Sequence, residues 1–391
     1  MIQQIPITND EIYELSAFAF QFTPAPEEIE KKKEAKKHET VWGWLEGENL
    51  AAKVHLIPLE TRIHGKIIKT GGISSVATWP EYRRKGAVRQ LLIHAIREMK
   101  KEGYLVSYLA PFSVPFYRKF GWEMTINEMQ FTIPMERVPK FKGINGNVQR
   151  MKAGEESVLK EAYQEYTKQY TGMLARDDHW WEHKIFSKKE LNTAISYDDK
   201  GNVDGYIRYK VKDSKMNIDE WVAITPDSKK RLLQFISNHD SMAKEVHLTL
   251  PDDDLLPLFM EEPRAKQEQK PYFMTRIVDV ESFLKVYPFL KQGDREETYT
   301  ITVKDEICEE NSGFYQIHFQ NGTHHIEKTE NPAEQNLTAS LSIQQLAMLL
   351  LGKITLEQLY QQAFISGDLD NIVKLDTYLP KKQHPYLADF F

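Results

Sequence analysis

The chain is organised around residues 71–124, which read GGISSVATWPEYRRKGAVRQLLIHAIREMKKEGYLVSYLAPFSVPFYRKFGWEM. The segment Ile73 to Thr78 is rich in β-branched residues, which favour strands. Pro80 follows and cannot donate to a ladder, so the pattern predicts that the strand stops there. A basic turn, Arg83 to Gly86, comes next. The first half of this stretch therefore predicts a strand that leads into a positively charged turn.

A one-sided helix follows the turn. Apolar residues recur at helical spacing from Val88 to Met99, and Gly103 ends the pattern. A strand that leads through a basic turn into a helix brings unpaired backbone N–H groups and the positive end of the helix dipole to one point. Such a point binds phosphate, and Gly86 would let the backbone approach the anion closely because it has no Cβ. The sequence thus predicts a phosphate site at the start of this helix.

Two motifs in the stretch carry a resemblance to a known family. The sequence Arg83-x-x-Gly86-x-Val88 is similar to the pyrophosphate-binding motif Gln/Arg-x-x-Gly-x-Gly/Ala of the GNAT N-acetyltransferases, although Val88 departs from the small final residue. The sequence from Pro115 to Trp122, PFYRKFGW, resembles the GNAT segment in which a tyrosine lies beside the sulfur of acetyl-CoA. With the chain length and the C-terminus, these motifs make the whole chain resemble the Eis (enhanced intracellular survival) branch of that family.

The resemblance implies acetyl-CoA as the co-substrate and a set of site residues. Tyr117 is the expected general acid, because a phenol can give a proton to the departing thiolate. The backbone of Val76 to Thr78 would pair with the pantetheine arm as an added strand does. The expected cofactor-binding residues are Val76, Ala77, Thr78, Arg83, Arg84, Lys85, Gly86, Ala87, Val88, Arg89, Phe112 and Ser113. The alternative for Tyr117 is that it is one more aromatic in a packing segment.

The C-terminal sequence, residues 387–391, ends in two large apolar residues, Phe390 and Phe391. An exposed tail rarely needs such residues, so we expect the tail to be packed onto the body of the protein. In the Eis family the terminal phenylalanine carboxylate reaches the active site of the first domain, and Phe391 matches that ending. The resemblance implies that Phe391 binds and orients a cationic substrate and helps to remove its proton. The alternative is that the two phenylalanines only dock the tail.

The residues on either side of the central stretch fit a first GNAT domain. Residues 7–22 open with a helix-capping sequence and continue with a largely apolar face. Residues 28–39 are charged and helix-prone, which usually marks a solvated helix face, with a nucleic-acid patch as the minor alternative. Residues 40–59 and 61–70 alternate like antiparallel strands with glycines at the breaks. Residues 129–135 would close this domain as an edge strand.

A second segment, from about Gln149, resembles a degenerate copy of the first domain. Val222 to Asp227 aligns with Val76 to Glu81 at a constant offset of 146, and a basic run and a predicted helix, Leu232 to Met242, follow again. At that offset Leu232 replaces Gly86, and its side chain would cover the amides that phosphate needs. We therefore predict a second GNAT-like domain that does not bind CoA. The alternative is a chance similarity of two short strand-helix units.

The pattern changes towards the C-terminus. Residues 263–272 have few apolar residues and predict a linker or loop. Beyond about Val280, alternating segments predict strands, and capped helices follow them. The strands are expected at 299–304, 313–319, 324–330 and 339–342. Three helices are expected after them: one begins at Ser342, the next begins at Thr355, and the last spans 371–379. Strands followed by helices predict an α+β domain, and this one resembles the sterol-carrier-protein-like (SCP2-like) domain that ends Eis proteins.

The composition is that of a globular protein. Of 391 residues, 41% are hydrophobic and 28% charged, and no apolar run has the length of a membrane span or a signal peptide, so we expect a cytoplasmic protein without a membrane partner. The formal net charge of -6 argues against nucleic acid and is compatible with a cationic substrate. The single cysteine, Cys308, excludes an intrachain disulfide and a Cys-based zinc site. His324 and His325 face opposite ways in a predicted strand, so no metal is expected.

The predicted fold class is α/β and α+β. The expected domains are 1–147 (GNAT, binding acetyl-CoA), 148–283 (degenerate GNAT-like) and 284–391 (SCP2-like). The predicted function is transfer of acetyl from acetyl-CoA to an amine of a cationic, multi-amine acceptor of the aminoglycoside kind. The alternatives are acetylation of a protein lysine or a polyamine, or a lipid or sterol carrier in which the GNAT domains are scaffolding. Because Eis relatives are hexameric, the resemblance also implies a homo-oligomer, with a hexameric ring as the expected form.

Overall fold

The computed structural model describes residues 1–23, 25–291, 293, 296–329 and 337–391. The contacts divide the chain into two compact units. The first unit contains residues 1–125, 273–382 and 389–391, and the second contains residues 126–272 and 383–388. The division into three domains at residues 147 and 283 stays a prediction.

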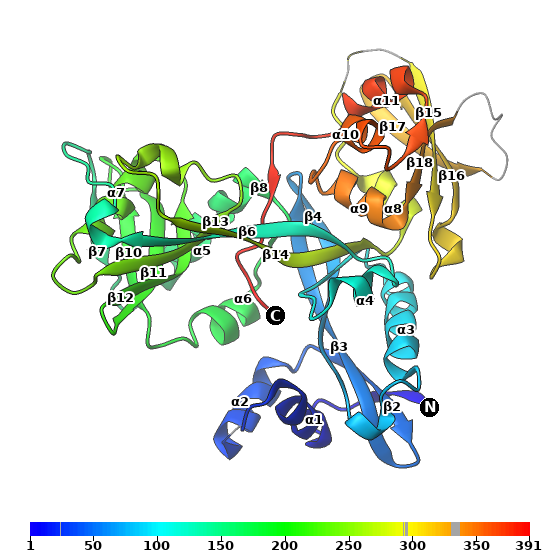
Figure 1. The fold of residues 1–391 in the computed structure, drawn as a ribbon, viewed down its shortest axis with the longest axis horizontal. Coiled ribbons are helices and arrows are strands. Elements are labelled where there is room, and N and C mark those ends of the chain that lie inside the picture. The colour runs from blue at the N-terminus through cyan, green and yellow to red at the C-terminus, as the bar shows by residue number, and fades with distance from the viewer. Residues whose placement is uncertain (24, 292, 294–295, 330–336) are drawn as a thin grey trace. The chain divides into compact units, whose positions relative to one another are not determined.

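The first unit begins with a sheet flanked by helices (Figure 1). The strand order is β1-β2-β3-β4-β5, followed by the C-terminal half of β14, and every neighbouring pair is antiparallel except β4 and β5. A parallel pair needs a crossover, which α3 supplies. The elements are β1 (Ile2–Ile5), α1 (Glu11–Phe20), α2 (Pro26–Ala35), β2 (Thr40–Glu46), β3 (Asn49–Ile63), β4 (Lys66–Thr78), α3 (Ala87–Lys101), β5 (Val106–Leu109), α4 (Val114–Arg118), β6 (Glu123–Pro134) and β14 (Lys266–Ile277).

The helix α3 packs on this sheet through the apolar stripe that the sequence predicts. The buried residues of the stripe join a core cluster with one face of β3 and with Ile73 of β4: Leu91, Leu92, Ala95, Ile96 and Met99 of α3, and Ala52, Val54 and Leu56 of β3. A Cβ on Gly71 would lie 2.3 Å from Sδ of Met99, so the close approach of helix and sheet requires a glycine there. The core of the first unit therefore fixes α3 directly behind β4.

The rest of the first unit is an α+β fold, as the order of strands and helices predicts. Its sheet has the order β17-β16-β15-β18-β19. Ser342 and Thr355 cap α9 and α10 through capping boxes, which confirms the two predicted helix starts. The elements are α8 (Val280–Val286), β15 (Glu297–Lys304), β16 (Gly313–Gln320), β17 (Thr323–Thr329), β18 (Leu337–Ser342), α9 (Ile343–Leu350), α10 (Leu356–Gln361), β19 (Ser366–Gly367) and α11 (Leu369–Asp376). Residue 330, at the end of one predicted strand, lies outside the described residues.

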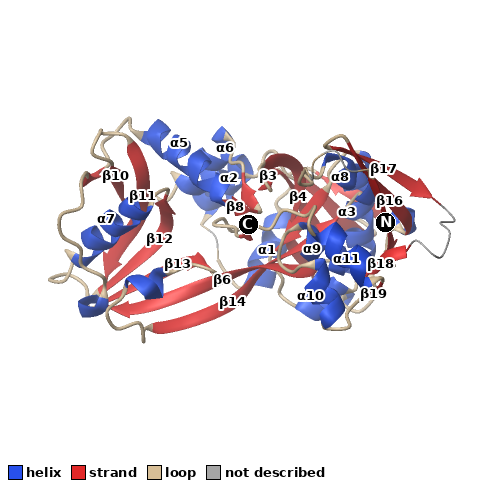
Figure 2. Ribbon diagram, turned by 90° about the horizontal axis from the view of Figure 1, so that it is seen from above, coloured by secondary structure: helices blue, strands red, loops and turns tan. Residues whose placement is uncertain are grey.

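The second unit is a further sheet with helices (Figure 2). Residues 128–134 of β6 pair with β13, and the order continues β13-β12-β11-β10-β7. The pair β12 and β13 is parallel and α7 connects it, which repeats the arrangement of β4, α3 and β5. The elements are β7 (Asn147–Arg150), α5 (Glu156–Tyr166), β8 (Tyr170–Thr171), α6 (Asp178–Trp180), β10 (Asn192–Tyr197), β11 (Val203–Lys212), β12 (Lys215–Ala223), α7 (Pro226–Ser237), β13 (Glu245–Pro251) and β20 (His384–Pro385).

Two strand assignments from the sequence are wrong. Residues 129–135 do not close the first sheet as an edge strand, because residues 128–134 pair with β13 in the second unit. Residues 263–272 are not a linker, because β14 begins at Lys266. The first part of β14 is almost entirely exposed, so it carries polar side chains on both faces and lacks the apolar alternation by which strands are recognised.

Within the described residues, no helix is long and apolar enough to cross a membrane. Cys308 is buried as a free thiol, and burial raises its pKa, so the reactive thiolate form is disfavoured.

Candidate active site

The strands β4 and β5 separate in the middle of the first sheet. They pair in parallel only at Thr70, Gly71 and Gly72, and β4 then runs on to Thr78 with β3 on its other side. Ser75 has a φ of 50°, and the β3–β4 register shifts beside it, so a bulge bends this part of β4. The backbone of Val76 to Thr78 thus forms an edge where an extended ligand can add to the sheet.

The turn after β4 brings the backbone to the start of α3 in a left-handed conformation. Arg84 and Gly86 have φ values of 64° and 84°. A Cβ on Gly86 would meet no atom within 4 Å, so the space in front of this residue is open. The first intrahelical bond runs from Gln90 N–H to the Gly86 carbonyl, which leaves the N–H groups of residues 87–89 without an intrahelical partner. No side chain caps this end and its first turn has no acidic residue, so an anion can bind there.

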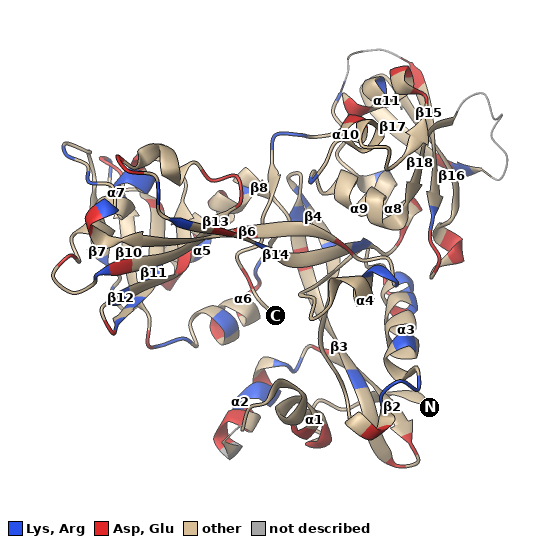
Figure 3. Ribbon diagram, in the orientation of Figure 1, with Lys and Arg blue, Asp and Glu red and all other residues tan. Residues whose placement is uncertain are grey.

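The cations of the predicted motif surround this helix start. Arg83, Arg84, Lys85 and Arg89 are exposed, and Figure 3 shows basic residues along α3. Val88, the residue that departs from the family motif, packs against the core cluster behind β4. Its side chain therefore points into the protein, which explains why a larger residue is compatible with an open phosphate site.

Tyr117 lies on α4, the short helix that follows β5. It is 3% exposed, and its ring contacts those of Phe112, Phe116 and Trp122 at centroid distances of 5.2, 5.1 and 6.3 Å. Its hydroxyl makes no hydrogen bond within the described part of the chain. Burial raises its pKa above the ordinary value of 10, so the phenol keeps its proton at neutral pH. Ser113 precedes α4 as its N-cap residue without a side-chain capping bond.

Phe391 lies at the point where β4 and β5 separate. A Cβ on Gly72, the last β4 residue that pairs with β5, would lie 2.8 Å from Cε2 of Phe391. The Phe391 ring also contacts Phe273 of β14, with centroids 4.9 Å apart. Phe391 is therefore packed, as the sequence predicts, and lies over the strand that carries the expected cofactor edge, whereas Phe390 is exposed.

A buried polar cluster on the other face of β3 was not predicted. Lys53 Nζ donates to Ser16 Oγ at 2.6 Å and lies 2.9 Å from Nε2 of His55, whose Nδ1 lies 2.7 Å from Oε2 of Glu39. Lys53 is fully buried. Burial and the nearby Lys36 charge lower the pKa of Lys53 to about 7. One signal was available: Lys53 and His55 are two residues apart in a predicted strand, so they share a face.

Burial and the Lys53 charge lower the pKa of His55 to about 3. Burial would by itself raise the pKa of Glu39, but the hydrogen bond from His55 and the Lys36 charge lower it to about 2. At neutral pH, Glu39 is therefore charged and His55 neutral.

The start of α7 in the second unit differs from that of α3, but not in the way that the constant offset predicts. The helix begins at Pro226, so the basic run 229–231 lies within it and Leu232 is a core residue rather than the counterpart of Gly86. The N-cap is Thr225, whose Oγ1 accepts a hydrogen bond from Ser228 N–H at 3.0 Å. This side chain caps the first turn of α7, whereas no side chain caps the start of α3. That the second domain does not bind CoA stays a prediction.

Within the described residues, no group of three or more potential ligands could hold a metal ion. His324 and His325 do not form a pair, because His324 lies against the backbone carbonyls of Leu284 and Lys285.

Family comparisons agree with this architecture. Residues 8–125 and 172–277 each match a model of the acetyltransferase (GNAT) domain, and residues 280–388 match a model of the sterol carrier protein domain. The fold and these matches define the class: the chain belongs to the GNAT N-acetyltransferases, with two GNAT domains followed by a sterol carrier protein domain.

Known relatives narrow the class to the Eis-like proteins. The N-acetyltransferase Eis of Mycobacterium tuberculosis is 24% identical over 225 residues, which are 54% of this chain and 55% of that protein. An uncharacterized N-acetyltransferase of Streptomyces avermitilis is 22% identical over 244 residues, 56% of this chain and 58% of that protein. The matched region thus spans little more than half the length of these curated relatives.

Solved structures resemble the whole chain. A probable N-acyltransferase from Enterococcus faecalis is 29% identical, has a TM-score of 0.92, and covers 100% of this chain and 99% of its own. Eis1 from Mycobacterium abscessus has the same fold, with a TM-score of 0.83, 18% identity and full coverage of both chains. The chain therefore resembles the Eis-like GNAT proteins in its fold and in its order of domains.

Proposed function

We propose that this protein transfers the acetyl group of acetyl-CoA to an amine of a cationic acceptor that carries several amino groups. The proposal rests on one observation. The open start of α3 follows strand β4, and the buried Tyr117 follows strand β5, which pairs in parallel with β4. The carboxyl ends of parallel strands meet at the same edge of a sheet. A diphosphate-bearing thioester that lies on the β4 edge would therefore extend between them.

The donor would be held by backbone and charge. The pyrophosphate would accept hydrogen bonds from the N–H groups of residues 87–89, and the pantetheine arm would pair with the open β4 edge. The proposed contacts are Val76, Ala77 and Thr78 for the arm, Arg83, Arg84, Lys85, Gly86, Ala87, Val88 and Arg89 for the diphosphate, and Phe112 and Ser113 beside the thioester. Positioning both reactants in this way can remove about 7 to 11 kcal/mol of the barrier.

We propose that Tyr117 stabilises the leaving group. As the acceptor nitrogen attacks the thioester carbonyl, the C–N bond forms, the C–S bond breaks and negative charge develops on sulfur. The Tyr117 hydroxyl has no competing partner among the described residues and can donate a hydrogen bond to that sulfur. Since burial raises the pKa of Tyr117, complete proton transfer is more strongly uphill than for an exposed phenol, and the hydrogen bond supplies most of the stabilisation.

We propose that Phe391 acts on the acceptor. Its ring lies over Gly72, so its backbone carboxylate would lie near the end of the β4–β5 pairing, beside the expected thioester. A carboxylate there attracts an ammonium group and, when desolvated, accepts a proton from it more readily, because burial raises a carboxylate pKa. The acceptor class fits the formal net charge of -6, which raises the local concentration of polycations.

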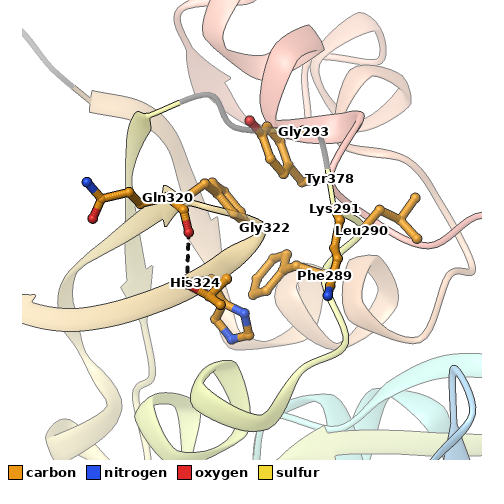
Figure 4. Close-up of a pocket in the computed structure, with 10 residues that line it drawn as sticks. Phe289, Leu290, Lys291, Gly293, Gln320, Gly322, His324 and Tyr378 are labelled. Carbon is orange, nitrogen blue, oxygen red and sulfur yellow. Dashed lines mark hydrogen bonds between the residues drawn. The ribbon is translucent and has the colours of Figure 1, made fainter.

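The rival function, a lipid or sterol carrier, depends on an apolar cavity in the C-terminal region. The pocket in Figure 4, between Phe289, His324 and Tyr378, has a volume of only about 20 Å³. A cavity of roughly 10 to 15 Å³ already holds one water, so this one is too small for a sterol or an acyl chain. The acetyltransferase is the better supported function.

The experiment is acetyl-CoA turnover, followed by release of the free thiol, with an aminoglycoside, a polyamine and a lysine peptide as acceptors. We expect thiol release that depends on the acceptor and is fastest with the aminoglycoside. A faster rate with the polyamine or the peptide would assign the acceptor to that class. Absence of acetyl-CoA binding, together with tight binding of a fatty acid, would overturn the proposal. Light scattering of the same sample tests the proposed homo-oligomer.

A further inference from the structure

We infer that Arg276 and Gln344, two residues distant in sequence from the acetyl-CoA motif, are positioning residues that fix α4 and thereby aim the Tyr117 hydroxyl. The inference rests on the proposed function, because it assigns these residues an effect on acetyl transfer through Tyr117. It concerns only contacts within the first unit.

The C-terminal end of α4 is held by side chains as well as by its own backbone. The N–H groups of Phe120 and Gly121 donate to the carbonyls of Tyr117 and Arg118, and two side chains add hydrogen bonds to this segment. Gln344 Nε2 of α9 donates to the Arg118 carbonyl at 2.9 Å, and an Arg276 guanidinium nitrogen donates to the Phe120 carbonyl at 2.5 Å. The two acceptors are one and three residues beyond Tyr117. Both bonds therefore act on the segment whose orientation sets the direction of the phenol.

Arg276 is held rigidly. It is fully buried on β14, and its second nitrogen pairs with Oδ2 of Asp305 at 2.5 Å. Asp305 also accepts from the side chain of Asn311, whose Oδ1 accepts from Lys100 at the end of α3. A buried arginine with a fixed partner keeps one geometry, because moving it would leave a desolvated charge unpaired. Through Asp305 and Asn311, Arg276 thus connects the segment after α4 to α3, the helix that begins at the expected diphosphate site.

The sequence motif after Tyr117 fits this arrangement. Gly121 has a φ of 86°, and a Cβ there would lie 1.6 Å from the Arg276 guanidinium and 3.0 Å from Ile343 Cγ2. The glycine in FGW is therefore required because Arg276 and α9 occupy the space of a side chain. The motif therefore contains both Tyr117 and the glycine that leaves room for Arg276.

The region that supplies Gln344, Ile343 and Asp305 lies within residues 280–388, which match the sterol carrier protein domain. We assign this domain a role in the efficiency of the first GNAT domain, through α4.

The test is a double-mutant cycle between Gln344 and Tyr117 in the full-length protein. Gln344→Glu keeps the shape but removes the N–H donor, whereas Gln344→Lys retains a donor. We expect Gln344→Glu to lower kcat about threefold to tenfold with acetyl-CoA affinity unchanged, and Gln344→Lys to recover at least half of the rate. In a Tyr117→Phe background, Gln344→Glu should have no further effect, because coupled residues are not additive.

Gln362→Glu, the same change at an exposed residue beyond α10, is the matched control and should retain the wild-type rate. Arg276→Lys is the second variant, and we expect it to act in the same direction, with thermal unfolding showing how much of the protein is folded. Equal loss of rate from Gln344→Glu with and without the Tyr117 hydroxyl, or an unchanged rate, would overturn the inference. So would a normal rate for Tyr117→Phe. An inactive wild-type protein would instead refute the proposed acetyltransferase itself.

Discussion

Gly72 and Phe391 lie in contact: a Cβ on Gly72 would come within 2.8 Å of Cε2 of Phe391 and 3.3 Å of the Ile57 Cβ. The contact joins the last residue of the sequence to the last β4 residue that pairs with β5. The ring is held by a gap in the sheet surface that only glycine provides, so a single methyl group at residue 72 must displace it.

We therefore expect Gly72→Ala to lower kcat, by about tenfold, while acetyl-CoA affinity changes less than twofold, because the added methyl group moves Phe391 away from the thioester. Deletion of Phe391 moves the terminal carboxylate by one residue and should impair turnover at least as much. Phe390→Ala is the control, since Phe390 is 67% exposed. If the deletion variant had unaltered kinetics, Phe391 would have no role in catalysis and would only pack the tail onto the protein.

Tyr117→Phe removes the hydroxyl but keeps the buried ring. We expect kcat to fall by about 100-fold, in the range that acid catalysis contributes, with little change in the affinity for acetyl-CoA. Steady-state thiol release and calorimetric binding measure the two quantities. Phe116→Tyr, which places a hydroxyl on the neighbouring half-buried ring, should not restore the rate in the same chain. A wild-type rate in Tyr117→Phe would remove the acid role.

Gly86→Leu should abolish acetyl-CoA binding, because the side chain would occupy the open space in front of the residue 87–89 amides. The backbone strain of a non-glycine residue at φ 84° complicates such a variant, so a control must carry the same strain. Gly65→Leu does so: Gly65 has φ 86° and also opens to free space, but it lies in the β3–β4 turn. We expect similar melting temperatures for both variants and loss of binding in only one. Equal acetyl-CoA affinity in both would contradict a diphosphate site at α3.

Lys53 should make stability depend on pH. Its pKa in the folded protein is about 7, below the ordinary value of 10.5, so the unfolded chain binds more protons between these values. The contribution of Lys53 to the free energy of unfolding therefore rises with pH from about 7 to 10.5 and is lowest below pH 7. Lys53→Met should stabilise the protein by about 2 kcal/mol near pH 6.5, after the loss of its hydrogen bonds, and by much less near pH 10.

Thermal unfolding of wild type and Lys53→Met between pH 6 and 10 measures this difference. The contribution of His55 to the pH dependence lies mostly below this window, since its pKa is about 3 in the folded protein and 6.5 as the ordinary value. Glu39, whose pKa is lowered to about 2, keeps its charge throughout the measured range. Lys31→Met, at an exposed lysine of α2, is the matched control and should change the free energy of unfolding by less than about 0.5 kcal/mol. A pH-independent difference for Lys53→Met would show that the buried amine remains charged.

The local sequence was sufficient to predict several of the helices, including the one that begins at the expected diphosphate site. The spacing from Val88 to Met99 predicts α3, and Ser342 and Thr355 predict the starts of α9 and α10, because each signal acts over one or two helical turns. Phe390 and Phe391 predict a packed tail for a similarly local reason, because removing a large apolar side chain from water is favourable.

Tertiary structure decided what the local pattern could not. Strand pairing is a contact between distant residues, so the placement of 128–134 against β13 and the existence of β14 followed from partners far along the chain. The α7 start was misplaced because a constant offset assumes loops of equal length. Only folding brought Phe391 over Gly72, Arg276 against Gly121, and Ser16 and Glu39 beside Lys53 and His55. In each case the free energy comes from desolvated contacts between segments that no sequence window contains together.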